Sequence, residues 1–190
     1  MKINVLALIA IIVLLTACGD KKKKRTEDEK NFPVLPYILS QVKDVDTSLY
    51  SITKIVTVDS VSDTTFIARE SFRKEAQDFL EIPDISSSKY EDDYTESKFF
   101  DETLNRVVMT YTKTPDAKQA VQKQEITISP NQFTGDKIVS VYIDYATNTK
   151  DSAVQKRMLW MVDKSFQVTR MVQKPGGAQT TTTTTVTWHD

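Results

Sequence analysis

The sequence predicts an α+β fold in which two N-terminal helices pack on a curved antiparallel β-meander of six or seven strands. Apolar residues recur every three or four positions over residues 35–57, and residues 66–80 have an apolar side and a charged side. Both patterns are typical of helices with one buried face. From about residue 98 to residue 188, short segments rich in Val, Ile, Thr and Tyr alternate with turn residues, which is typical of strands.

The first predicted helix covers residues 35–57. Its apolar stripe consists of Leu35, Ile38, Val42, Val45, Leu49, Ile52 and Val56. Pro36 suits the first helical turn, where its missing N–H costs no hydrogen bond. β-Branched residues crowd the end of this stretch, however, so residues 50–58 could instead form a strand.

The second predicted helix covers residues 66–80 and follows a turn-like run, Asp59–Asp63. Its apolar side is formed by Ala68, Phe72, Ala76, Phe79 and Leu80. Ile82-Pro83 ends it, because proline disfavours a helical conformation in the preceding residue. Two amphipathic helices with a short connection predict a helical hairpin that covers one face of the sheet.

Six strands are predicted after the helices, with a seventh at residues 94–100. The six cover residues 105–113, 121–129, 137–146, 154–162, 166–173 and 179–188. Short connections between successive strands require antiparallel pairing. The predicted core residues of this sheet are Val107, Met109, Ile126, Ile128, Val139, Val141, Ile143, Met158, Trp160, Val162, Phe166, Val168 and Trp188.

The first eighteen residues form a separate region. Lys2 gives a positive start, residues 5–15 carry no polar side chain, and Leu15-Thr16-Ala17-Cys18 closes the run with the only cysteine of the chain. The apolar run is too short to cross a bilayer, which needs about 20 helical residues. Its flanks instead fit a cleaved secretory signal peptide.

The Leu-Thr-Ala-Cys ending resembles the lipobox of bacterial lipoproteins. The resemblance implies that a diacylglyceryl group joins the Cys18 thiol, that cleavage separates Ala17 from Cys18, and that the new amine is acylated. Two or more acyl chains make membrane anchoring stable. The alternative is an ordinary cleaved leader with a chance cysteine.

Three regions follow from this prediction. Residues 1–17 are the signal peptide, residues 18–31 are the lipidated Cys18 and a flexible charged tether, and residues 32–190 are a single α+β domain. In the enteric sorting rule, Asp directly after the cysteine retains a lipoprotein in the inner membrane. Gly19 stands there, so the outer membrane is the favoured location, and exposure to the periplasm or to the exterior is left open.

Charge and composition narrow the function. From Phe32 onward the chain has 18 basic and 22 acidic residues, which argues against nucleic acid as a partner. The single histidine, His189, is next to the C-terminus, and only four glycines are present. We therefore expect no catalytic residues, no metal site and no cofactor.

Two further features suggest contacts or modification. Asp59-Ser60-Val61, Asp63-Thr64-Thr65 and Asp151-Ser152-Ala153 resemble the O-glycosylation sequon of exported Bacteroidetes proteins, which implies Ser60, Thr64 and Ser152 as acceptors. The six-threonine run, Thr180–Thr185, predicts a ladder of hydroxyls that could bind glycans or water, or simply form a wet strand face.

Together these features predict a membrane-anchored exported lipoprotein with a non-enzymatic binding or accessory domain at the cell envelope. Its partners are the membrane through the lipid anchor, and an envelope protein, lipid or glycan. The alternative is a lipid or lipoprotein carrier, with an apolar cavity between helices and sheet lined by Phe72, Phe79, Met158 and Trp160. The fold of the outer-membrane lipoprotein receptor is similar to the predicted one, which is a fold-level analogy.

Overall fold

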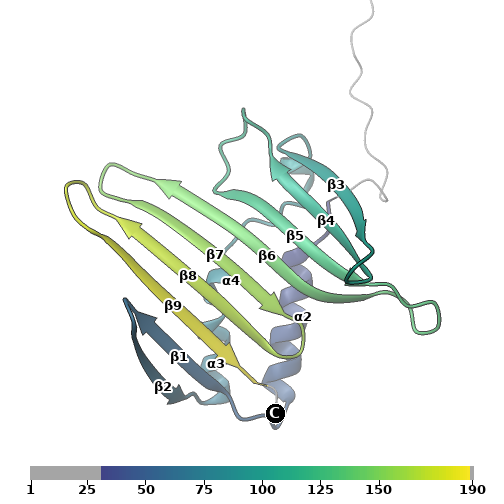
Figure 1. Ribbon diagram of the computed structural model, residues 1–190, viewed down its shortest axis with the longest axis horizontal. Helices are drawn as coiled ribbons and strands as arrows, with labels where there is room; N and C mark the ends of the chain where they lie inside the picture. Colours follow the sequence, from purple (N-terminus) through teal and green to yellow (C-terminus); the bar gives the residue numbers. More distant parts are fainter. Residues whose placement is uncertain (1–30, 189–190) are drawn as a thin grey trace, which may run out of the picture. The chain divides into compact units, whose positions relative to one another are not determined.

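The computed structural model describes residues 31–188. The signal peptide, Cys18, the tether as far as Lys30, and His189 lie outside the described residues. Within the described residues, a nine-stranded antiparallel sheet carries three α-helices on one face (Figure 1).

The elements of residues 31–188 are three α-helices, one 3-10 turn and nine strands. The helices are α2 (Val34–Thr47), α3 (Arg69–Glu75) and α4 (Gln77–Leu80), with a 3-10 turn, η2 (Ser88–Tyr90). The strands are β1 (Thr53–Val58), β2 (Val61–Phe66), β3 (Tyr94–Asp101), β4 (Arg106–Lys113), β5 (Val121–Ser129), β6 (Lys137–Asn148), β7 (Ala153–Met161), β8 (Ser165–Gln173) and β9 (Gln179–Thr187). Their order across the sheet is β2-β1-β9-β8-β7-β6-β5-β4-β3.

The predicted fold class is wrong in its balance of helix and strand. The sheet has nine strands rather than six or seven, and the helices are short. The first helix ends at Thr47 and does not continue to residue 57, because Ser48 is already extended with ψ 170°. Residues 53–58, which are almost all β-branched, form β1 between β9 and β2. The strand alternative for residues 50–58 is therefore the correct one.

The segment predicted as a turn and helix start is also a strand. β1 and β2 form a hairpin through Asp59 and Ser60, and Asp59 takes the left-handed conformation with φ 55°, which aspartate tolerates better than most residues. The second helix therefore begins only at Arg69. It is interrupted at Ala76, where ψ is 2°, and continues as α4.

The remaining strands are confirmed. All seven segments predicted between residues 94 and 188 are strands, with ends that differ from the prediction by at most two residues, and every neighbouring pair is antiparallel. Strands β3 to β9 form one meander, and the β1–β2 hairpin extends it beyond β9. The signal was clear here because alternating, β-branched segments are separated by short turns.

Aromatic rings fill the space between α3, α4 and the sheet. The Phe72 ring centroid lies 5.0 Å from that of Trp188, and the Phe79 centroid lies 5.2 Å from that of Trp160, both edge to face. Trp160 also stacks on Phe166 at 5.4 Å. All four residues predicted to line an apolar cavity (Phe72, Phe79, Met158 and Trp160) have 0% of their surface exposed. They form packed core, as aromatic pairs of this geometry commonly do.

Helix α2 lies against the same face. Its buried residues, Val34, Ile38, Val42 and Val45, have the spacing of a single apolar stripe. Two hydrogen bonds fix its start: Tyr111 Oη accepts from the Phe32 N–H at 3.0 Å, and Asn31 Nδ2 donates to the Ile85 carbonyl at 2.9 Å. Within residues 31–188, no helix combines the length and apolar character needed to span a membrane.

Candidate functional site

The sheet face that the helices leave uncovered, here named the open face, carries its side chains in regular rows. Residues directly opposite in neighbouring strands share a face, so each row can be followed from β6 to β9. The rows are Asn148-Ala153-Gln173-Gln179, Ala146-Gln155-Met171-Thr181, Asp144-Arg157-Thr169-Thr183 and Tyr142-Leu159-Gln167-Thr185. The only ionised side chains in these four rows are in the third row.

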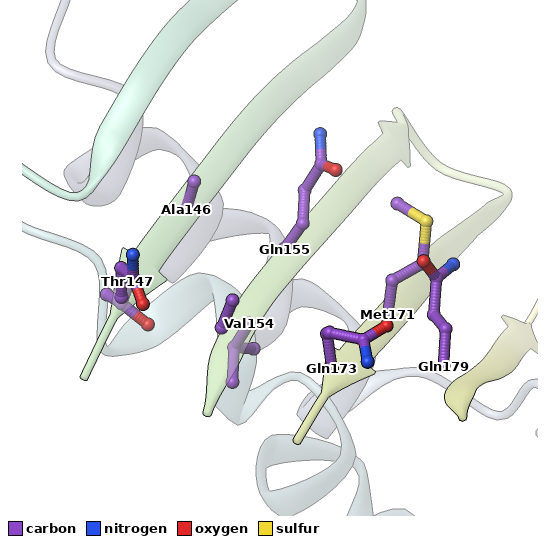
Figure 2. Close-up of a pocket in the computed structure, with 9 residues that line it drawn as sticks. Ala146, Thr147, Val154, Gln155, Met171, Gln173 and Gln179 are labelled. Carbon is purple, nitrogen blue, oxygen red and sulfur yellow. The ribbon is translucent and has the colours of Figure 1, made fainter. Parts of the chain in front are cut away.

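The first two rows form a groove at one end of the open face, which we name the hairpin-end groove (Figure 2). It has a volume of about 470 Å³, which is within the range of small-molecule sites. Its lining is Ala146, Thr147, Asn148, Ala153, Val154, Gln155, Met171, Gln173 and Gln179. The groove lies where β6 turns into β7 and β8 into β9, and Figure 1 shows these two hairpin ends side by side.

A smaller hollow of about 300 Å³ adjoins the groove. It shares Asn148, Ala153 and Gln173 with the groove and continues onto the two hairpin turns. The turn residues that line it are Thr149, Ser152, Lys174, Pro175 and Gly176. A ligand in the groove can therefore extend towards the turns.

Gln173 is held in place by the β8–β9 turn. Its Nε2 donates to the carbonyls of Gly177 at 2.6 Å and Lys174 at 3.1 Å. Gly176 has φ +68°, a conformation that glycine adopts without strain. With its nitrogen bound to two carbonyls, the Gln173 amide presents its oxygen as the free group.

Gln155 is oriented in a similar way. Its Nε2 donates to Asp144 Oδ1 at 3.4 Å, which leaves its oxygen available. Within the described part of the chain, the side chains of Asn148 and Gln179 make no hydrogen bond, so each offers both a donor and an acceptor. In Figure 2, the side chains of Met171, Gln173 and Gln179 lie close together on β8 and β9, with Gln155 on β7.

The residues of the groove carry no charge. The nearest charged row contains Asp144 and Arg157, which are directly opposite each other on β6 and β7. Further along the open face, burial raises the pKa of the Tyr142 hydroxyl and nearby Asp144 raises it further, although Arg157 and Lys123 oppose the shift. Tyr142 therefore stays neutral, and Lys123 Nζ lies 5.1 Å from its ring centroid.

A different cavity lies between the helices and the sheet. It measures about 460 Å³ and is lined mainly by charged side chains, including Lys74, Glu81 and Arg170. Two ion pairs cross it: Lys54 Nζ lies 2.7 Å from Glu75 Oε2, and Lys156 pairs with Asp78. This cavity differs from the apolar one predicted for a carrier, because acyl chains placed against these groups would remove them from water without compensation.

The predicted modification sites lie in different surroundings. Ser60 is exposed in the β1–β2 turn, Ser152 is half-buried in the β6–β7 turn, and Thr64 is exposed but lies within β2 rather than in a turn. Ser152 lines the hollow beside the groove. Cys18, the predicted lipidation site, lies outside the described residues.

The acidic residues around β3 form no metal site. Across residues 31–188, no three side chains of the His, Cys, Asp or Glu type come together in an arrangement that could hold a metal ion. Asp93 instead accepts a hydrogen bond from Gln119 Nε2 at 2.8 Å. This carboxylate therefore has a structural partner.

The threonine run forms most of β9 and is divided between the two faces. Thr181, Thr183 and Thr185 lie on the open face, where Thr183 Oγ1 is 3.2 Å from Thr169 Oγ1 and Thr185 Oγ1 accepts from Gln167 Nε2 at 3.2 Å. Thr184 points the other way and lines the charged cavity. Two hydroxyls of the predicted ladder, those of Thr183 and Thr185, thus hydrogen-bond to side chains of β8.

Sequence reasoning missed the hairpin-end groove. Its amides come from four strands, and only the register of the sheet brings Asn148, Gln155, Gln173 and Gln179 together. A usable signal was the presence of Asn or Gln within two residues of both predicted turns, at Asn148 and at Gln173.

Comparison with known proteins gave no relative. No family model matches the chain, and no significant match was found among curated proteins or among solved structures.

Proposed function

We propose that this chain is an exported lipoprotein, anchored by acyl chains on Cys18, whose folded domain binds a partner at the cell envelope without catalysing a reaction. The proposed location is the outer membrane, as the residue after Cys18 suggests. The observation that carries the binding role is the hairpin-end groove, which is large enough for a ligand and is lined by oriented amides.

The chemistry of the groove favours binding over catalysis. Its lining consists of amide, hydroxyl and apolar side chains, none of which exchanges protons readily near neutral pH. The groove also sits on four strands in the middle of the sheet, which supplies a rigid frame. Rigid frames reduce the entropy lost when a ligand binds.

The alternative role, a lipid carrier, has less support. The space between helices and sheet contains packed aromatic rings and a charged cavity. Neither suits an acyl chain.

The binding role is tested by filling the groove. Ala153→Trp places a large side chain in it, whereas Ser165→Trp alters a small residue at the other end of the same face. Both are made in the Cys18→Ser background and sedimented with purified cell envelopes.

Ala153→Trp should reduce sedimentation with envelopes at least tenfold, and Ser165→Trp should leave it unchanged. Equal sedimentation of the two variants, or no sedimentation of the Cys18→Ser parent, would contradict a groove-mediated role. Circular dichroism checks that each variant is folded.

A further inference from the structure

We propose that the hairpin-end groove recognises an uncharged, hydroxyl-rich ligand, that is, a neutral glycan. This inference rests on the proposed function, because it names the ligand class of the same groove. Four observations carry it: the oriented acceptors, the uncharged lining, the fully paired backbone of the floor strands β7 and β8, and the small apolar surface between the amides.

The groove presents hydrogen-bond acceptors in fixed positions. The amide nitrogens of Gln155 and Gln173 are bound to Asp144 and to two turn carbonyls, so their oxygens are directed to other donors. Sugar hydroxyls are donors that also accept, and they can satisfy these oxygens while accepting from the free amides of Asn148 and Gln179.

The absence of charge in the lining selects against ionised ligands. No Asp, Glu, Lys or Arg lines the groove, and the adjoining hollow has Lys174 as its one charged lining residue. An anionic or cationic ligand would lose water around its charge in the groove without gaining a counter-charge there. A neutral ligand avoids this loss.

Backbone pairing argues against an extended peptide on the floor of the groove. Peptides that bind sheets commonly add a strand to a free edge. The floor strands β7 and β8 are paired on both sides along their whole length, whereas β9 pairs with β1 only from Thr182 to Thr187, which leaves the backbone of residues 179–181 open on that side. Recognition over β7 and β8 therefore depends on side chains, as it does for a sugar.

The surface between the amides is small and apolar. Ala146, Ala153 and Met171 belong to the two rows that form the groove. The C–H faces of a sugar ring can pack on this surface while its hydroxyls reach the amides, which removes apolar area from water. Thr181, directly opposite Met171, extends the polar surface towards the threonine ladder.

The test is calorimetric titration of the full-length Cys18→Ser protein with defined probes. The probes are neutral hexasaccharides of glucose, mannose and N-acetylglucosamine, the anionic hexamer of galacturonic acid, and the uncharged peptide N-acetyl-(Gly-Ser)₃-amide. At least one neutral hexasaccharide should bind with a Kd of about 1 mM or tighter. The galacturonic acid hexamer and the peptide should bind at least about tenfold more weakly.

Variants locate the binding. Gln155→Leu and Gln179→Leu each remove an amide from the groove, and each should weaken binding about three- to tenfold, the usual effect of one hydrogen bond. Gln167→Leu is the matched control, since it is the same change on β8 in the fourth row of the same face. It should change the Kd less than twofold.

The outcomes separate this inference from the proposed function. The glycan proposal is overturned if no neutral hexasaccharide binds, or if Gln167→Leu weakens binding as much as Gln155→Leu. Peptide binding that Gln155→Leu weakens would reject the glycan and retain the groove as a protein-binding site. If no probe binds and Ala153→Trp leaves envelope sedimentation unchanged, both proposals fail.

Discussion

Val45 and Leu49 show how two residues of one apparent stripe can have opposite environments. Val45 is 3% exposed beneath α2, whereas Leu49 is 93% exposed in the connection to β1. The four-residue spacing is the same in the sequence, but α2 ends between them. Leu49 therefore contributes nothing to the core, contrary to the predicted stripe.

Charge substitutions should separate the two positions. Val45→Asp places a carboxylate at a position that is only 3% exposed and should lower the free energy of unfolding by several kcal/mol. Leu49→Asp should change it by less than about 0.5 kcal/mol, as exposed substitutions commonly do. Urea denaturation at neutral pH measures the free energy of unfolding of both variants. Similar losses for Val45→Asp and Leu49→Asp would indicate that Leu49 is buried, as a longer helix would require.

Three tyrosines with raised pKa values should make the stability of the domain fall at alkaline pH. Burial raises the pKa of Tyr37 to about 12, with Asp163 and Asp44 adding to the effect. Burial likewise raises the pKa of Tyr94 and of Tyr111. Tyr94 Oη donates to the Val121 carbonyl at 3.0 Å, which requires the protonated form.

The stability of the domain should fall as pH rises above 10, because folding raises these pKa values. In the unfolded chain these tyrosines ionise near pH 10, whereas the folded domain keeps them protonated. Their contribution to the free energy of unfolding is therefore complete below pH 10 and is lost as pH rises from 10 through 12. Denaturation midpoints at pH 8, 10 and 11 should fall progressively, and more shallowly for Tyr94→Phe than for the parent. A midpoint that is constant to pH 11 would contradict this account.

At the scale of elements, the sequence predicts the meander well and the N-terminal third poorly. Seven strands between residues 94 and 188 are separated by turn residues such as Asn105 and Asp163, which take positive φ. Residues 51–58 combine the apolar spacing of a helix with the β-branched composition of a strand. Pairing with β9 makes residues 53–58 a strand. That pairing joins segments more than a hundred residues apart, which local patterns do not reveal.

Hydrogen exchange tests the assignment of β1. Amides of Thr53–Val58 should exchange slowly because this strand is paired on both sides, and those of Leu49 and Ser51, in the connection before it, should exchange quickly. Amides of the edge strand β2 should be intermediate on average. A continuous protected stretch from residue 35 to residue 57 would instead indicate the long helix.

At the scale of the whole molecule, we expect the folded domain and the proposed anchor to be separable. The core of residues 31–188 runs from Val34 to Trp188. Removing the predicted lipid attachment point should therefore change location without changing stability.

Cys18→Ser provides that test. Made together with Ala153→Trp, which removes the proposed groove-mediated binding to envelopes, the variant should move from the membrane fraction to the soluble periplasmic fraction, because a thioether-linked lipid needs the thiol. Its thermal midpoint, measured after purification, should equal that of the detergent-solubilised Ala153→Trp parent within about 2 °C, since the described core from Val34 to Trp188 is unchanged. A variant that stays in the membrane fraction would show that another part of the chain binds the membrane.

Little of the candidate site could be predicted from the sequence. The absence of a catalytic set directed attention to binding, and the threonine run suggested a polar sheet face. The groove itself depends on register, since a shift of one residue between β7 and β8 would move Met171 and Gln173 out of line with Gln155 and Ala153. Such registers follow from the whole sheet rather than from any segment.

The most direct measurement of the central claim is an amide NMR spectrum of labelled Cys18→Ser protein, titrated with the neutral hexasaccharide that binds best. The hairpin-end groove account predicts that the largest shifts fall on residues 146–155 and 171–179 and on the side-chain amides of Gln155 and Gln179. Shifts centred on the charged cavity around Lys54 and Arg170, or spread evenly over the sheet, would contradict it.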